Sequence, residues 1–218
     1  MYRSVLTAVT ALLLALCGAA QAAAPVFTEG QGYDRLAAVQ PVDHPGKVVV
    51  TEFFWYNCPH CAEFEPALEA WAKRQPGYVV LERVPVAFAP QFVEQQKLYY
   101  ALLALGKANA LQGQIFNAIH EQHIPLQTSQ QMADWLQGHG VPRQQFLNAF
   151  NSFSVQMQAN RASQMMADYQ ISGVPTLAVQ GTYTLSASLP QTSNHELLLQ
   201  SVDQLVRQLH QQGGKASP

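Results

Sequence analysis

Residues 53–61 read Phe-Phe-Trp-Tyr-Asn-Cys-Pro-His-Cys, and this stretch sets the expectations for the rest of the chain. The segment that leads into it, Lys47 to Trp55, is rich in β-branched and aromatic side chains and has the length of a buried central strand. Pro59 suits the first position of a helix, where its missing N–H removes no intrahelical hydrogen bond. The pattern therefore predicts a Cys-x-x-Cys motif at the junction of a strand and a helix.

The predicted position of the two cysteines indicates redox chemistry. Cys58 is expected at the helix N-terminus, where free backbone N–H groups and the helix dipole favour a thiolate and lower the pKa of the thiol. His60 can add a hydrogen bond or a positive charge to the same thiolate. Cys61, one turn later, is expected to face inward, to have a higher pKa and to act as the resolving thiol. A minor structural staple is the alternative interpretation of the pair.

The first two dozen residues are typical of an export signal. Arg3 precedes an apolar run from Val5 to Leu16, and the small residues near Ala22 and Ala24 offer two cleavage sites. A membrane anchor is the alternative, but the run is shorter than the roughly twenty apolar residues that span a bilayer. Cleavage removes Cys17 and leaves two cysteines in the mature chain, which argues for chemistry over a framework of structural bridges.

Composition excludes some classes of protein. The chain has 218 residues, of which 48% are hydrophobic, so it can build a sizeable core as one domain or as one domain with an inserted lobe. Charged residues make up 12%, against about 25% in an average soluble domain. The net charge of −2 provides no positively charged surface for nucleic acid.

Periodicity predicts the order strand, helix, strand, followed by a helical segment. Before the central strand, Tyr33 to Val39 is expected to be a short strand or turn. The helix that starts at Pro59 should run to about Arg74, and Tyr78 to Phe88 reads as the next strand. Apolar positions at spacings of three and four then predict helices at Phe92–Leu105, Ala108–His120, Ser129–Gln137, Arg143–Phe150 and Val155–Tyr169.

The last part of the chain returns to strands and closes on a helix. Thr176–Gln180 and Thr182–Ser186 are expected to be two strands with a turn at Gly181. Ser193 and Glu196 fit a capping box at the start of the final amphipathic helix.

Cys-Pro-His-Cys after an aromatic-rich strand resembles the DsbA family of periplasmic thiol:disulfide oxidoreductases, which belong to the thioredoxin superfamily. The resemblance covers nearly the whole mature chain and includes Gly-Val-Pro-Thr at residues 173–176. It implies an α/β, thioredoxin-like fold with an inserted α-helical domain. The implied domains are a signal peptide at 1–24, a discontinuous thioredoxin-like domain at 25–90 and 158–218, and a helical insertion at 91–157.

The resemblance also assigns roles to single residues. It makes Cys58 and Cys61 the catalytic pair, with Pro59 and His60 tuning its redox properties. By the same resemblance Pro175 is a cis-proline facing the cysteines and, with Val174, helps to hold an extended substrate segment.

Glu52 matches the buried acidic residue of the family, on the strand that leads to the site, where it could move protons to or from Cys61. An exposed carboxylate at the strand end is the alternative interpretation. The family commonly pairs this acid with a lysine, whereas Arg83 stands at the matching position here. Arginine does not readily release a proton, so we expect an ion pair, while the arginine argues against proton sharing within that pair.

The expected function is the introduction of disulfide bonds into exported proteins that carry free cysteines, by donation of the Cys58–Cys61 disulfide. The resemblance implies a periplasmic location, no cofactor beyond that disulfide, and reoxidation by a DsbB-type, quinone-linked inner-membrane protein. Two alternatives stay open: a periplasmic reductase or isomerase on the same fold, and a substrate-binding chaperone with a structural cysteine pair. His120 and His123 could join the cysteines as zinc ligands, but the spacing of a zinc site is not otherwise met and no metal is expected.

Overall fold

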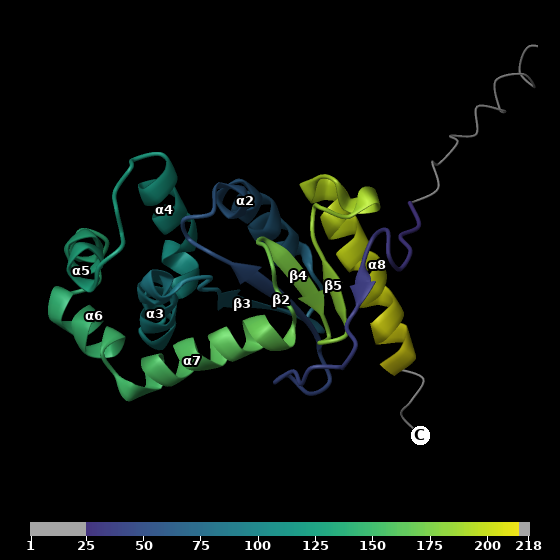
Figure 1. The fold of residues 1–218 in the computed structure, drawn as a ribbon, viewed down its shortest axis with the longest axis horizontal. Helices are drawn as coiled ribbons and strands as arrows, with labels where there is room; N and C mark the ends of the chain where they lie inside the picture. Colours follow the sequence, from purple (N-terminus) through teal and green to yellow (C-terminus); the bar gives the residue numbers. More distant parts are fainter. Residues whose placement is uncertain (1–24, 214–218) are drawn as a thin grey trace, which may run out of the picture.

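A mixed sheet lies at the centre of the molecule, with helices on both faces and a helical lobe at one end (Figure 1). The computed structural model describes residues 25–213, so the predicted signal peptide lies outside the described residues. Within this range the chain forms a five-stranded sheet with the strand order β1-β5-β4-β2-β3. The strands are β1 (Asp34–Arg35), β2 (Val48–Phe54), β3 (Val79–Pro85), β4 (Thr176–Val179) and β5 (Tyr183–Leu185).

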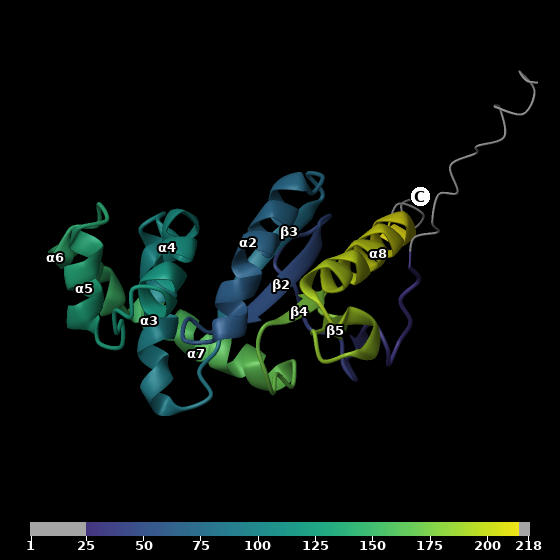
Figure 2. The same ribbon diagram turned by 90° about the horizontal axis from the view of Figure 1, so that it is seen from above.

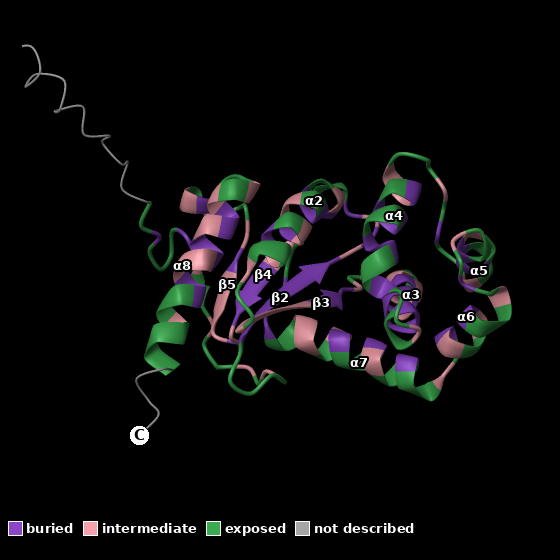
Figure 3. Ribbon diagram, turned by 180° about the vertical axis from the view of Figure 1, so that it is seen from behind, coloured by how far each residue is buried: buried purple, intermediate pink, exposed green. Residues whose placement is uncertain are grey.

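β2 is the central strand that leads to the cysteine motif. All seven of its residues are buried, as expected for a β-branched and aromatic run covered on both faces (Figure 3). It pairs in parallel with β3 and antiparallel with β4. The first pairing sets Glu52 opposite Arg83, and the second sets Phe53 opposite Thr176. These two registers bring distant segments of the chain to the end of β2.

Seven α-helices surround the sheet within the described residues. α2 and α8 lie over one face, α7 runs along the other, and α3 to α6 gather beyond one end of the sheet (Figures 1 and 2). The helices are α2 (Pro59–Arg74), α3 (Val93–Ala104), α4 (Ala108–His120), α5 (Ser129–Gln137), α6 (Arg143–Phe150), α7 (Phe153–Asp168) and α8 (His195–Gly213). None of the helices in residues 25–213 combines the length and the apolar character needed to cross a membrane.

The core has two parts, one on each face of the sheet. Side chains alternate between the two faces of the sheet along β2. Val48 and Val50 therefore lie in the apolar cluster under α2 and α8, whereas Phe53 lies in the cluster shared with the helical lobe. Cys58 and Cys61 belong to the second cluster. The motif therefore lies where the sheet meets the lobe, and the apolar side chains of both parts surround it.

The observed order of elements agrees with the predicted one. The predicted bounds of α2, α4, α5 and α6 are confirmed, and most boundaries of the other elements differ by one to three residues. α7 begins at Phe153 because the Ser152 hydroxyl accepts a hydrogen bond from the Val155 N–H at 3.3 Å and caps the helix. α7 continues without a break across positions 157 and 158, the boundary at which the predicted helical insertion ends and the thioredoxin-like domain resumes.

The predicted capping box of Ser193 and Glu196 is wrong. Asn194 precedes α8, and its Oδ1 accepts a hydrogen bond from the Leu197 N–H at 2.9 Å. Asparagine is as good a cap as serine, and the turn that ends at Ser193 leaves the following residue at the capping position. A capping box does form at α5, where Thr128 and Gln131 bond each other's backbone N–H groups.

Candidate active site

Cys58 occupies the N-cap position of α2, as the sequence predicts. Its backbone is extended, with φ −82° and ψ 116°, and its carbonyl accepts the Ala62 N–H at 3.1 Å. Pro59 is the first helical residue. Cys58 is 8% exposed and Cys61 is fully buried, and the two thiols are not bonded to each other. Both thiols are therefore free in the structure, and Cys58 is less deeply buried than Cys61.

The two thiols differ strongly in acidity. A hydrogen bond from the Cys61 thiol lowers the pKa of Cys58 to about 6, and the backbone N–H groups of Cys61 and His60 add to the effect against the opposing influence of burial. The charge of His60 lowers it further, although the imidazole is largely exposed and lies 3.5 Å from a carboxylate oxygen of Glu63. The same hydrogen bond and burial raise the pKa of Cys61. At neutral pH Cys58 is a thiolate and Cys61 a thiol.

The loop before β4 completes the exposed side of the site. The Val174–Pro175 peptide bond is cis, which confirms the conformation that the resemblance implies. The Val174 carbonyl oxygen lies 3.4 Å from the Cys58 Sγ. This contact joins residues 116 positions apart in the sequence, and the pairing of β2 with β4 makes it possible.

A buried charged cluster lies under α2. Arg83 donates from Nε to Glu52 at 3.0 Å, which confirms the predicted ion pair. Its Nη2 also lies 2.9 Å from carboxylate oxygens of both Glu65 and Glu69. Sequence reasoning missed these two acids. Their spacing of four residues from Cys61 and from each other, which places all three on one face of the helix, was the available signal.

Burial dominates the acidity of this cluster. It raises the pKa of Glu52 to about 7 and that of Glu65 to about 8, against the opposing charge of Arg83. The pKa of Glu69 is lowered, because hydrogen bonds from Arg83 and Lys73 outweigh its partial burial. Burial by itself disfavours the charged form of Arg83, but the facing carboxylates raise its pKa overall. The guanidinium therefore stays charged, and burial favours the protonated form of the two buried acids.

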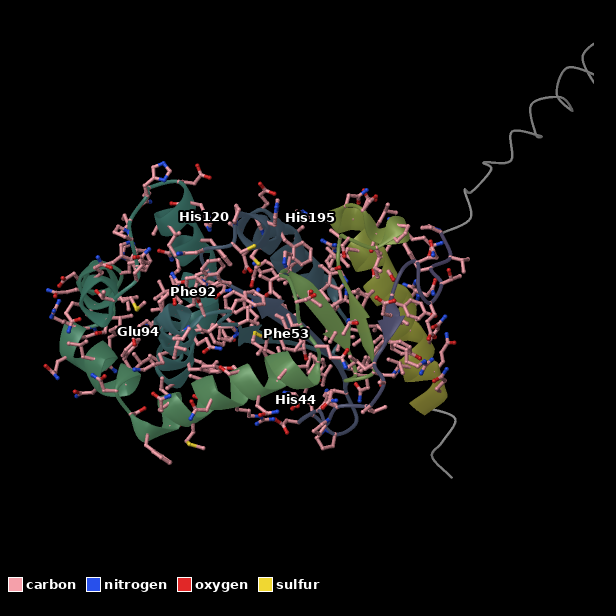
Figure 4. All side chains as sticks on the ribbon, in the orientation of Figure 1. His44, Phe53, Phe92, Glu94, His120 and His195 are labelled. Atoms are coloured by element: carbon pink, nitrogen blue, oxygen red, sulfur yellow. The ribbon has the colours of Figure 1, made fainter. Side chains whose placement is uncertain are left out.

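The helical lobe holds the loop between β2 and Cys58. The Tyr56 hydroxyl donates to Gln112 of α4 at 2.7 Å, and the Tyr56 carbonyl lies 2.8 Å from the Nε2 of His120 on the same helix. Gln95 of α3 donates to the Asn57 side chain at 2.8 Å. His120, labelled in Figure 4, therefore contacts the active-site loop and not the sulfur atoms. In residues 25–213 no group of three or more His, Cys, Asp or Glu side chains is arranged to hold a metal ion.

The fold and this geometry define a class of protein. The sheet and α2 place a cysteine of low pKa at a helix N-terminus, above a second, buried cysteine and beside a loop that contains a cis-proline. This arrangement forms a thioredoxin-like thiol-disulfide exchange site. Within this class, the protein is distinguished by the helical lobe that is inserted between β3 and β4.

Comparison with known proteins identifies the family. A model of the DSBA-like thioredoxin domain matches residues 49–203. The thiol:disulfide interchange protein DsbA of Burkholderia cepacia is 45% identical over 206 residues, which cover 91% of this chain and 94% of the relative. The protein of the same name from Pseudomonas aeruginosa is 37% identical over 179 residues, covering 82% and 84%. The crystal structure of P. aeruginosa DsbA matches with a TM-score of 0.79 at 34% identity, over 86% of this chain and 97% of that one.

The chain belongs to the DSBA-like thioredoxin domain family. It is a protein disulfide oxidoreductase that introduces disulfide bonds by donating the Cys58–Cys61 disulfide. The predicted α/β, thioredoxin-like fold with an inserted helical domain is confirmed. The reductase or isomerase and chaperone alternatives find no support in these relatives.

Proposed function

We propose that this oxidoreductase works in the periplasm on exported proteins with free cysteines, and that it needs no cofactor besides its own disulfide. One observation carries the proposal: the helix N-terminus, Cys61 and His60 together lower the pKa of Cys58 to about 6. Each unit of such a shift corresponds to about 1.36 kcal/mol in favour of the thiolate. Stabilising the reduced protein makes its disulfide a stronger oxidant of other thiols.

The exchange proceeds through a mixed disulfide. A substrate thiolate attacks Cys58 Sγ, the Cys58–Cys61 bond breaks, and Cys61 leaves as a thiolate that takes up a proton because its pKa is raised. A second substrate thiolate then attacks the substrate sulfur, which forms the substrate disulfide and releases Cys58 as a thiolate. Two electrons pass from the substrate to the cysteine pair.

Five further residues have proposed roles in this cycle. Pro59 starts α2 directly after Cys58, and His60 supplies an N–H group and charge to the Cys58 thiolate. Val174 and Pro175 hold an extended substrate segment beside the sulfur of Cys58. Glu52, buried beneath the motif, exchanges a proton with Cys61.

Reoxidation completes the cycle. We propose that a DsbB-type, quinone-linked inner-membrane protein accepts the two electrons of the dithiol, as the family membership suggests. Residues 1–24 are proposed to direct export, with cleavage near Ala22 or Ala24. N-terminal sequencing of the protein recovered from periplasmic extract tests this part, because an intact Met1 would contradict it.

The reduction potential tests the central proposal. Equilibration with glutathione buffers should give a value well above that of thioredoxin, about −270 mV, and closer to about −120 mV. A value at or below the thioredoxin figure would exclude the donor role. Cys58→Ser should abolish oxidation of a reduced substrate protein, whereas Cys61→Ser should accumulate mixed disulfides. If Cys58→Ser remained fully active, the chaperone alternative would replace the proposal.

A further inference from the structure

β3 is the last strand on one side of the sheet, and its outer edge pairs with no strand within residues 25–213. Hydrogen bonds at the two ends of β3 show which of its residues face that edge. At the start, the Tyr78 carbonyl accepts the Val48 N–H at 2.8 Å. At the end, the Val86 N–H donates to the Phe54 carbonyl at 2.8 Å. Because backbone groups alternate between the two sides of a strand, even-numbered residues of β3 face β2 and odd-numbered ones face outward.

The outer edge therefore carries the backbone N–H and C=O groups of Leu81 and Arg83. The neighbouring odd-numbered residues close the two ends of this stretch. The Val79 N–H donates to the carbonyl three residues earlier at 2.9 Å, and the Pro85 carbonyl accepts from the Gln96 side chain at 3.0 Å. Free donors and acceptors on two alternate residues are what an extended peptide needs to join a sheet as a further strand.

A groove of about 330 Å³ lies beside this edge, between β3, α3 and α7. It is lined by residues 80–84 of β3, by Tyr100 and Leu103 of α3 and by Met165 of α7. Its size is at the lower end of the range of ligand pockets, about 300–1,000 Å³. Leu103 is 45% exposed, so an apolar side chain of a ligand can reach it. We call this pocket and the outer edge of β3 the β3 groove.

The charged side chains that line the β3 groove each have a partner of opposite sign. Asp43 contacts Arg161 of α7, and the Nε2 of His44 lies 2.9 Å from Glu82 Oε1. The guanidinium of Arg83 is held by the acids beneath α2. This charge pairing suits a ligand without charge of its own, such as a peptide backbone with apolar side chains, better than a small anion or cation.

We propose that the β3 groove binds an extended segment of the substrate protein as an additional strand, apart from the segment held at Val174 and Pro175. The inference rests on the proposed action on exported proteins with free cysteines, because the backbone of such a chain is accessible before it folds. The bound segment pairs with Leu81 and Arg83 and places an apolar side chain against Leu103. Holding one part of the substrate raises the effective concentration of its cysteines at Cys58.

Hydrogen exchange of the wild-type protein tests the proposed pairing directly. The probe is reduced and carboxamidomethylated ribonuclease A, an unfolded chain without free thiols. With the free probe at ten times its dissociation constant, exchange of the Leu81 and Arg83 amides should slow about tenfold. The amides of Glu82 and Val84 should change little, because they already bond to β2.

Leu103→Glu tests the groove in catalysis, with Met157→Glu as its matched control. Met157 lies on α7 outside the groove and is 48% exposed, close to the exposure of Leu103. Leu103→Glu should raise the KM for reduced ribonuclease A with free thiols about tenfold, because a charge replaces an apolar contact. The change should be in KM and not in kcat, since neither cysteine lines the groove. Met157→Glu should keep the wild-type KM.

Three results would overturn the inference. The first is an unchanged exchange rate at Leu81 in the presence of the probe, and the second is an equal KM for Leu103→Glu and Met157→Glu. The third is a dimer in sedimentation velocity that Leu103→Glu dissociates, which would assign the edge to a second copy of the chain. The exchange measurement uses the wild-type protein, so it decides the question even if Leu103→Glu fails to fold.

Failure of this inference can be distinguished from failure of the proposed function. The probe carries no thiol, so its binding does not depend on the redox properties of the cysteine pair. An oxidising potential with no protection at Leu81 rejects the β3 groove alone. A reducing potential rejects the donor function, while protection at Leu81 would still support a peptide site on β3.

Discussion

The acidity of one sulfur atom depends on a few groups around residue 58. The largest contribution to the low pKa of Cys58 comes from the Cys61 thiol, and backbone N–H groups follow. The charge of His60 is the smallest of these contributions and acts from an exposed ring. Fold geometry thus supplies most of the thiolate stabilisation, and the residue between the cysteines adjusts it.

His60→Ala should raise the apparent pKa of Cys58 from about 6 by less than one unit, because the backbone N–H of residue 60 remains. The pH dependence of Cys58 alkylation by iodoacetamide measures this value. The difference between wild type and variant should shrink in 1 M salt, where the screening length is about 3 Å. An unchanged alkylation profile in His60→Ala would show that the side chain plays no part.

At the scale of elements, α4 holds the active-site loop through a single stripe of residues. Gln112, Phe116 and His120 are four residues apart and therefore share one face of the helix. They contact the hydroxyl, the ring and the carbonyl of Tyr56, respectively. The inserted lobe thus positions the residue two places before Cys58, in addition to covering the sheet.

Tyr56→Phe should lower the free energy of unfolding by about 1–3 kcal/mol, because it leaves Gln112 Oε1 without its buried donor. Tyr169→Phe is a matched control. The Tyr169 hydroxyl is also buried but has no partner among the described residues, so its removal should be neutral or stabilising. Urea unfolding of the two variants measures the contrast, and equal losses would contradict the anchoring role of Gln112.

Asn194→Ala should destabilise α8 by about 1 kcal/mol, because it removes the acceptor for the Leu197 N–H. Ser193→Ala should change stability by less than about 0.5 kcal/mol. Thermal unfolding of the two variants distinguishes the observed cap from the one that the sequence pattern predicts. A larger loss in Ser193→Ala would restore the predicted capping box.

At the scale of the molecule, the site lies between two packed units. The sheet with α2 and α8 forms one core, and the lobe with α7 forms the other. The lowered pKa of Cys58 links redox state to the stability of the whole fold. Its folded value of about 6 lies below the reference value of 9.0. The thiolate therefore contributes stability that is complete above pH 9 and is lost as the pH falls through 6.

The reduced protein should consequently gain stability over the oxidised protein as the pH rises from 6 to 9, by at most about 4 kcal/mol. Calorimetry of both redox forms at each pH measures the difference, and contributions common to both forms cancel. The melting temperature of the reduced form should exceed that of the oxidised form most at pH 9. A difference independent of pH would contradict the assigned acidity of Cys58.

The sequence by itself determined the strand-helix order and the position of Cys58 at the start of α2, whereas the resemblance to the DsbA family added the expected ion pair of Glu52 with Arg83. Hydrophobic periodicity, proline placement and the spacing of the cysteines are local, so they can be read along the chain. Only the tertiary structure decided that Glu65 and Glu69 share Arg83 with Glu52, and that α4 anchors Tyr56. These contacts depend on strand register and on helix packing between segments far apart in the chain. No local sequence pattern specifies the register or the packing.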